Sequence, residues 1–195
     1  IGNGGAHFQG NISGTVTVAA GGHVLLTSSG GSDGYAQIGN GGIHTGGTVA
    51  GNINVSAGAG LDILAGDSGG AYAQIGNGGD GNDFSTNSGN IIVDVVGAIA
   101  IKGDGDYAQI GNGGSAGEED PTGTISVSAT GAISLSGGEG DIAYAQIGNG
   151  GVGTGDATSG DITVTSGGDL SLEGGSGDCA YAGIGNGGDS SSGNN

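Results

Sequence analysis

The chain has 195 residues, of which 54 are glycine, and it carries 19 acidic residues against one lysine, for a formal net charge of −18. This acidic excess excludes nucleic acid as a partner, because a single cation cannot neutralise phosphates. One cysteine excludes an internal disulfide, and no apolar run is long enough to insert into a membrane. The glycine content is typical of flexible linkers, but the regular recurrence of apolar residues argues against disorder.

One eight-residue motif organises the sequence. YAQIGNGG occurs at 35–42, 72–79, 107–114 and 144–151, its variant YAGIGNGG at 181–188, and its tail IGNGG at 1–5. The steps between the motif isoleucines are 37, 37, 35, 37 and 37 residues. A fixed period of this size is typical of a solenoid. Residues 1–195 are therefore predicted to be a single solenoid segment of five repeats, cut from a longer array.

Each repeat contains three short runs in which apolar and polar residues alternate. In the second repeat these runs are Ile53-x-Val55, Leu61-x-Ile63 and Ala73-x-Ile75. Alternation of β-branched residues with Thr, Ser, Asn and Asp indicates half-buried strands. Three strands separated by glycine turns predict one coil, and stacked coils lie about 4.8 Å apart. The predicted fold is therefore all-β, a parallel β-helix with one three-strand coil per ~37-residue repeat.

Within the motif, the same alternation predicts Ala and Ile inside the coil and Tyr and Gln outside. Stacking then aligns the motif isoleucines in an internal column: Ile38, Ile75, Ile110, Ile147 and Ile184. It aligns the turn asparagines in a ladder that could pass hydrogen bonds from coil to coil: Asn3, Asn40, Asn77, Asn112, Asn149 and Asn186.

The tyrosines are predicted to form one outward stripe, with glutamines beside it: Tyr35, Tyr72, Tyr107, Tyr144 and Tyr181. Two interpretations remain open. The stripe could bind glycans or dock another solenoid, since exposed apolar patches mark contacts. Alternatively, the rings only stack on one another or lie under the variable loop.

Calcium is the one cofactor that these residues could hold. The segment GGDGNDFS (78–85) resembles one copy of the nonapeptide of calcium-binding β-rolls, which implies Asp80 and Asp83 as ligands. Separately, three acids precede their tyrosine by three residues and would stack about 5 Å apart, where a hard cation could bridge them: Asp104, Asp141 and Asp178. The alternative is a row of solvated charges screened by salt. Lys102 is expected between Asp67 and Glu139 of neighbouring coils.

The unit GDITVTSGGDLSLEGGSGDCAYAGIGNGG (160–188) resembles the repeats of large bacterial surface adhesins of the filamentous haemagglutinin type. The resemblance extends over essentially the whole chain. It implies a right-handed parallel β-helix on the bacterial cell surface or in the extracellular medium, acting in attachment, biofilm or filament structure. The partners it implies are adjacent repeats, further copies, glycans or host surfaces.

Two alternatives stay open beside this interpretation. One is a calcium-stabilised secreted solenoid without adhesive activity, and a more remote one is a polysaccharide-binding or polysaccharide-degrading β-helix. An enzyme is not expected, because catalytic sites on such folds combine acids with Lys, Arg or His on one face. The three histidines, His7, His23 and His44, are not expected to share one repeat position or to lie beside an acid pair.

Overall fold

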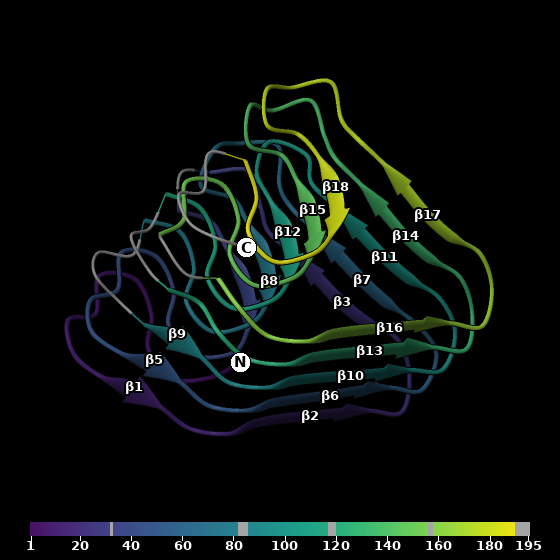
Figure 1. Ribbon diagram of the computed structural model, residues 1–195, viewed down its shortest axis with the longest axis horizontal. Helices are drawn as coiled ribbons and strands as arrows, with labels where there is room; N and C mark the ends of the chain where they lie inside the picture. The colour runs from purple at the N-terminus through teal and green to yellow at the C-terminus, as the bar shows by residue number, and fades with distance from the viewer. Residues whose placement is uncertain (32, 82–85, 117–119, 156–157, 190–195) are drawn as a thin grey trace.

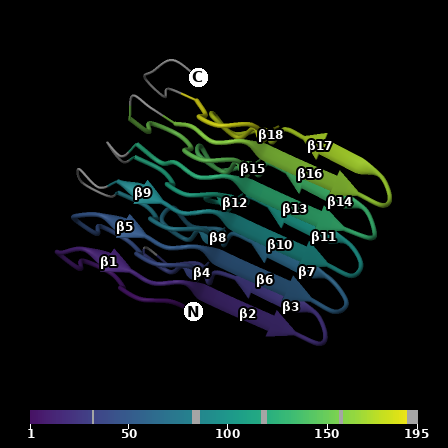
Figure 2. The same cartoon turned by 60° about the horizontal axis from the view of Figure 1, so that its bottom comes forward.

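The chain is a β-solenoid of about four turns in a computed structural model that describes residues 1–31, 33–81, 86–116, 120–155 and 158–189. All of the regular structure in these ranges is β-strand. The strands of successive repeats lie side by side, parallel and in register, so each coil lies on the one before it (Figure 2). The all-β fold and the tandem-repeat organisation predicted from the sequence are confirmed.

Three sheets of five strands run along the stack. Sheet 1 comprises β2 (Val16–Ala20), β6 (Ile53–Ala57), β10 (Ile91–Val95), β13 (Ile125–Ala129) and β16 (Ile162–Ser166). Sheet 2 comprises β3 (Val24–Thr27), β7 (Leu61–Leu64), β11 (Ile99–Lys102), β14 (Ile133–Ser136) and β17 (Leu170–Glu173). Sheet 3 comprises β4 (Ala36–Ile38), β8 (Ala73–Ile75), β12 (Ala108–Ile110), β15 (Ala145–Ile147) and β18 (Ala182–Ile184).

A fourth, short sheet was not predicted. It comprises β1 (Ile12–Ser13), β5 (Val49–Ala50) and β9 (Asn87–Ser88). Its strands hold two residues each, too few for an alternating pattern to stand out in the sequence. The short sheet lies where the chain returns from the motif to sheet 1 (Figure 1).

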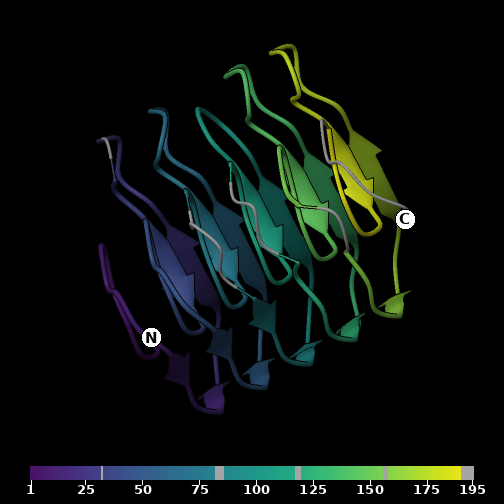
Figure 3. The ribbon, with the colours of Figure 1, turned by 60° about the vertical axis from the view of Figure 1, so that its left-hand side comes forward.

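The coil is right-handed. In Figure 1 the chain follows β2 from left to right and then climbs back along β3, so that it circulates anticlockwise. The successive coils advance toward the viewer, as the turned view in Figure 3 shows by bringing the C-terminal coils to the right. Anticlockwise circulation combined with an advance toward the viewer defines a right-handed helix, the hand that parallel β crossovers almost always take.

The main core fills the space that sheets 1, 2 and 3 enclose. Its alternate inward residues are aliphatic, and Ile53, Leu61 and Ile75 are fully buried. Like stacks on like, because Ile75 pairs in register with Ile38 on one side and with Ile110 on the other. The column of motif isoleucines continues through Ile147 to Ile184, as the sequence predicts.

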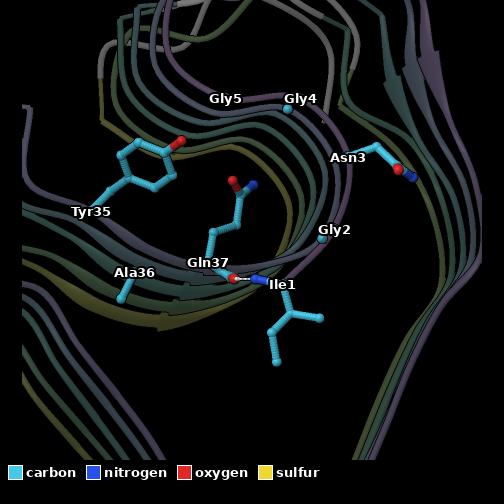
Figure 4. A pocket seen from close by; sticks show the side chains of 10 residues that line it. Ile1, Gly2, Asn3, Gly4, Gly5, Tyr35, Ala36 and Gln37 are labelled. Carbon is cyan, nitrogen blue, oxygen red and sulfur yellow. Dashed lines mark hydrogen bonds between the residues drawn. The ribbon is translucent and has the colours of Figure 1, made fainter.

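Sheet 3 separates the main core from a second core. After the IGNGG corner the chain does not turn directly into sheet 1; it loops back across the other face of sheet 3 and returns through the short sheet (Figure 1). In the first layer, Ala36 points to the main core, whereas Tyr35 and Gln37 point to the opposite side (Figure 4). Both faces of this sheet are therefore covered by protein.

The prediction of an outward tyrosine and glutamine stripe is wrong. The alternation is as expected, but the outer face of sheet 3 lies under the returning loop instead of in solvent. Tyr72, Tyr107 and Tyr144 are completely buried, as are Gln74 and Gln109. The alternative given with that prediction is the arrangement observed: the rings stack on one another and lie under the loop.

Candidate functional site

The five tyrosines form one continuous column in the second core. Neighbouring ring centroids lie 4.9–5.1 Å apart, and the interplanar angles are 3–8°. Ile43 and Val152 pack against the column. Burial raises the pKa of Tyr72 and Tyr107 well above the ordinary value, so these phenols stay uncharged. The three central rings, of Tyr72, Tyr107 and Tyr144, are buried and therefore offer no surface to glycans or to another solenoid.

Each motif glutamine ties its own coil to the corner of the next. Gln74 Nε2 donates to the carbonyl oxygens of Gly111 at 2.9 Å and Gly113 at 2.6 Å. Because the side chains of Gln74, Gln109 and Gln146 are buried, these bonds satisfy groups that would otherwise be costly to desolvate. The same pair of bonds is made by Gln37 to Gly76 and Gly78, by Gln109 to Gly148 and Gly150, and by Gln146 to Gly185 and Gly187.

The motif asparagines form a second set of ties. Asn40 Oδ1 accepts from Asn3 Nδ2 at 3.0 Å, and Asn40 Nδ2 donates to Asn77 Oδ1 at 3.0 Å. The backbone N–H of Asn40 donates to the same Asn77 oxygen at 3.1 Å. Asn40 Nδ2 also donates to the Gly14 carbonyl at 2.8 Å, which fixes the corner to the start of sheet 1. Equivalent backbone-to-side-chain bonds join Asn77 to Asn112, Asn112 to Asn149 and Asn149 to Asn186.

The first and last letters of the motif are in contact. A Cβ at Gly114 would lie 2.5 Å from the hydroxyl oxygen of Tyr107 and 2.3 Å from the carbonyl oxygen of Gly79. A side chain is excluded at this corner because the tyrosine fills the space. A Cβ at Gly111, the first glycine of the motif, would lie 1.8 Å from the carbonyl oxygen of Gly148. The eight-residue motif is thus kept together by packing and hydrogen bonds across coils.

The variant YAGIGNGG alters one of these ties. Gly183 stands where the other copies have glutamine. The last described coil therefore lacks the glutamine amide that, in the other coils, donates to the corner carbonyls of the next coil. A hollow of about 280 Å³ lies there, lined by Tyr181, Gly183 and the corner 184–188. Tyr181 is still tied to the coil before it, because its hydroxyl donates to Gln146 Oε1 at 2.8 Å.

The predicted calcium ladder is not formed. Within the described ranges, no three His, Cys, Asp or Glu side chains come close enough to hold a metal ion. The loop between Lys102 and Tyr107 is three residues shorter than its equivalents, which shifts Asp104 out of line with Asp141. The carbonyl of Asp104 instead accepts from the N–H of Gly140.

The other acids of the calcium prediction are Asp178, Asp80 and Asp83. Gly177 lies against Gly140 of the preceding coil, so Asp178, which follows Gly177, is aligned with Asp141. It is not aligned with Asp104. Burial raises the pKa of Asp80, and Asp83 lies outside the described residues. Among the described acids of the prediction, Asp104 is therefore out of line with Asp141 and Asp178.

Two expectations about basic residues are also wrong. Lys102 Nζ lies 3.7 Å from Asp104 Oδ2 of its own coil, not between Asp67 and Glu139, and the pair is exposed. His7 and His44 do share a repeat position, since both follow the motif isoleucine by six residues. Their rings stack with centroids 5.2 Å apart.

Asp106 is the buried acid that the sequence analysis missed. Its carboxylate accepts from the N–H of Tyr107 at 2.7 Å and from the N–H of Gly70 in the preceding coil. Burial raises its pKa from 3.8 to about 6, and the two N–H bonds only partly oppose this effect. The signal was available, because the other motif copies are preceded by Gly or Ala. An acid next to a buried tyrosine marks a departure from that pattern.

No family model, curated protein or solved structure matches the chain. In the part of the chain that the structure describes, no helix is long and apolar enough to cross a bilayer. The arrangement of the side chains is therefore the basis for the functional argument. The repeated feature of that arrangement is the set of hydrogen bonds that join each coil to the next.

Proposed function

We propose that this chain is a stiff shaft segment of an extracellular bacterial surface or filament protein. The observation that carries the proposal is the repeated tie between coils: in each of four successive layers, a glutamine donates two bonds to the next corner. The asparagine ladder and the two apolar columns reinforce the same contact. Such redundancy favours a rod that keeps its length under load.

The resemblance to filamentous haemagglutinin repeats supports an extracellular location and a role in attachment or biofilm. Adhesive contacts are assigned to the variable loops and to the outward side chains of sheets 1 and 2, not to the tyrosines. In sheet 1 one outward column contains Thr17, Asn54, Ile92, Ser126 and Thr163, which pair with one another in register. This variation fits a surface that differs from coil to coil. Catalysis is not part of the proposal.

Small-angle X-ray scattering of tandem arrays tests the shaft role. Each added coil should lengthen the particle by about 4.8 Å, so an array of ten coils should exceed one of five by about 24 Å. A matched array in which the motif Gln and Asn are replaced by Ser separates the effect of the ties from that of length. A maximum dimension that grows only as the square root of residue number, as for a flexible linker, would refute the proposal.

A further inference from the structure

All six Asn-Gly dipeptides of the chain belong to the motif. Asparagine loses its side-chain amide most readily in front of glycine, because glycine has no side chain to hinder attack by its backbone nitrogen on the asparagine Cγ. Asn52 and Asn90, by contrast, are followed by the β-branched isoleucine. The asparagines that are most reactive by sequence are therefore those that form the ladder.

The loss of the amide needs neither an enzyme nor an oxidant. The glycine nitrogen bonds to the asparagine Cγ, the Cγ–Nδ2 bond breaks, and the proton of the glycine amide leaves with that nitrogen as ammonia. Water then opens the cyclic imide by breaking one of the two bonds that join the glycine nitrogen to the former asparagine. Breaking the bond to Cγ gives aspartate, and breaking the bond to the main-chain carbonyl carbon gives isoaspartate.

In the stacked coils both reacting nitrogens are held by hydrogen bonds. The attacking nitrogen of Gly113 donates its proton to the carbonyl oxygen of Asn77 at 2.8 Å. The leaving nitrogen, Asn112 Nδ2, donates to the carbonyl oxygens of Gly89 at 2.8 Å and Thr122 at 3.0 Å. The side chain of Asn112 is completely buried. Since attack requires release of the glycine proton and rotation of the asparagine side chain, the reaction proceeds only when the corner opens.

Each corner is held further by the glutamine of the coil before it. Gln74 Nε2 donates to the carbonyl oxygens on both sides of Asn112, and Gln109 holds the corner of Asn149 in the same way. The bond that holds the attacking nitrogen also recurs: Gly41 N donates to Asn3 O at 2.9 Å, Gly78 N to Asn40 O at 2.9 Å and Gly150 N to Asn112 O at 2.8 Å. The restraint on the reaction is therefore set corner by corner.

We propose that the asparagine ladder is a row of latent deamidation sites, and that each site is modified when its own corner opens and then prevents that corner from closing. Aspartate and isoaspartate have no side-chain N–H to donate. A carboxylate in place of Asn112 would face the carbonyl oxygens of Gly89 and Thr122 in a buried site, where an unpaired charge is costly. Isoaspartate also adds a carbon to the main chain, which moves the corner out of register. Opening of a coil is thus converted into a permanent covalent change.

Peptide mapping by mass spectrometry in ¹⁸O water tests the proposal, because hydrolysis of the imide places one water oxygen in the product. In the folded chain, Asn112 and Asn149 should be labelled at least about 100-fold more slowly than in the chain held unfolded in guanidinium chloride, since only the open fraction reacts. Asn52 and Asn90 should stay unlabelled in both states and serve as internal controls. Equal labelling rates at Asn112 in the two states would overturn the inference.

Two variants distinguish opening of one corner from unfolding of the whole chain. Gln74→Leu should accelerate labelling of Asn112 about tenfold relative to Asn149, because it removes two bonds to buried carbonyls at that corner. Gln109→Leu should instead favour Asn149, so each variant is the control for the other. Uniform acceleration at all motif asparagines would overturn the proposal.

The refolding of modified chains tests the second half of the proposal. A chain labelled to completion while unfolded should not regain its far-UV circular dichroism when the denaturant is removed, whereas a chain unfolded only briefly should regain it. Recovery of the fully labelled chain would show that the corners close over aspartate or isoaspartate, and would overturn the inference.

Discussion

Replacing Tyr107 by Phe is expected to stabilise the protein, whereas the same change at Tyr181 is expected to destabilise it. The hydroxyl of Tyr107 is buried and has no hydrogen-bond partner among the described residues, a state that costs about 1–3 kcal/mol. Removing the oxygen leaves a gap of roughly 20 Å³, which costs about 0.5 kcal/mol. The net gain for Tyr107→Phe is therefore about 0.5–2.5 kcal/mol.

Tyr181→Phe is the matched control. It removes the same atom from the same column, but this hydroxyl donates to Gln146 Oε1 at 2.8 Å. Loss of that bond costs about 0.5–1.5 kcal/mol. Urea denaturation followed by far-UV circular dichroism should thus separate the two variants by about 1–4 kcal/mol. Equal destabilisation of both would show that the hydroxyl of Tyr107 is satisfied, and would refute the reasoning.

Three further outcomes are expected. Gln74→Leu leaves two buried carbonyls without a donor and should lower the free energy of unfolding by about 2–4 kcal/mol in urea titrations. Asn112→Ala should lower it by a similar amount, whereas Asn3→Ala, at the exposed end of the ladder, should lower it less. Equal losses for the two asparagine variants would contradict the ladder. The folded-state pKa of Asp106, about 6, lies above the ordinary 3.8. Its contribution to the free energy of unfolding, roughly 3 kcal/mol, is therefore complete below about pH 4 and is lost as pH rises through 6. The stability of Asp106→Asn should not show this decrease between pH 4 and 6. Calorimetry with millimolar calcium should give no binding heat, and a chelator should leave the melting temperature unchanged; calcium-dependent stabilisation would contradict this expectation.

The layers of the fold could be predicted because strand pairing is strictly in register. Residues one repeat apart pair directly, as Ile53 does with Ile91, so a fixed spacing in the sequence becomes a column in space. The alternation of apolar and polar residues then sets the inward face of each strand. The asparagine ladder followed from the same two observations.

The second core could not be found by alternation alone, because alternation reports which side a residue faces and not what covers that side. A second indication was how much each outward position varies between repeats. The outward position of sheet 1 changes from Thr17 to Asn54 to Ile92, whereas Tyr and the neighbouring Gln are repeated almost without change. Strands whose two faces are both buried tolerate little change on either. Repetition on both faces therefore indicated burial on both.

The calcium ladder failed for a different reason. Counting back from the tyrosine aligned Asp104 with Asp141, but the pairing of Lys102 with Ser136 sets the register from the other end of the loop. The three missing residues fall between these two anchors. Sequence spacing predicts position only where no deletion separates a residue from the strand that holds it.

The second core gives each coil a cross-section with two lobes that meet at sheet 3. Resistance to bending rises steeply with the amount of material lying far from the neutral plane, so a two-lobed section is stiffer along the line joining its lobes than across it. A long array of such coils would bend mainly in the plane perpendicular to the line that joins the two lobes. The loops that cover the second core lie at the outer end of one lobe, so they would stay near the neutral plane and be neither stretched nor compressed when the array bends.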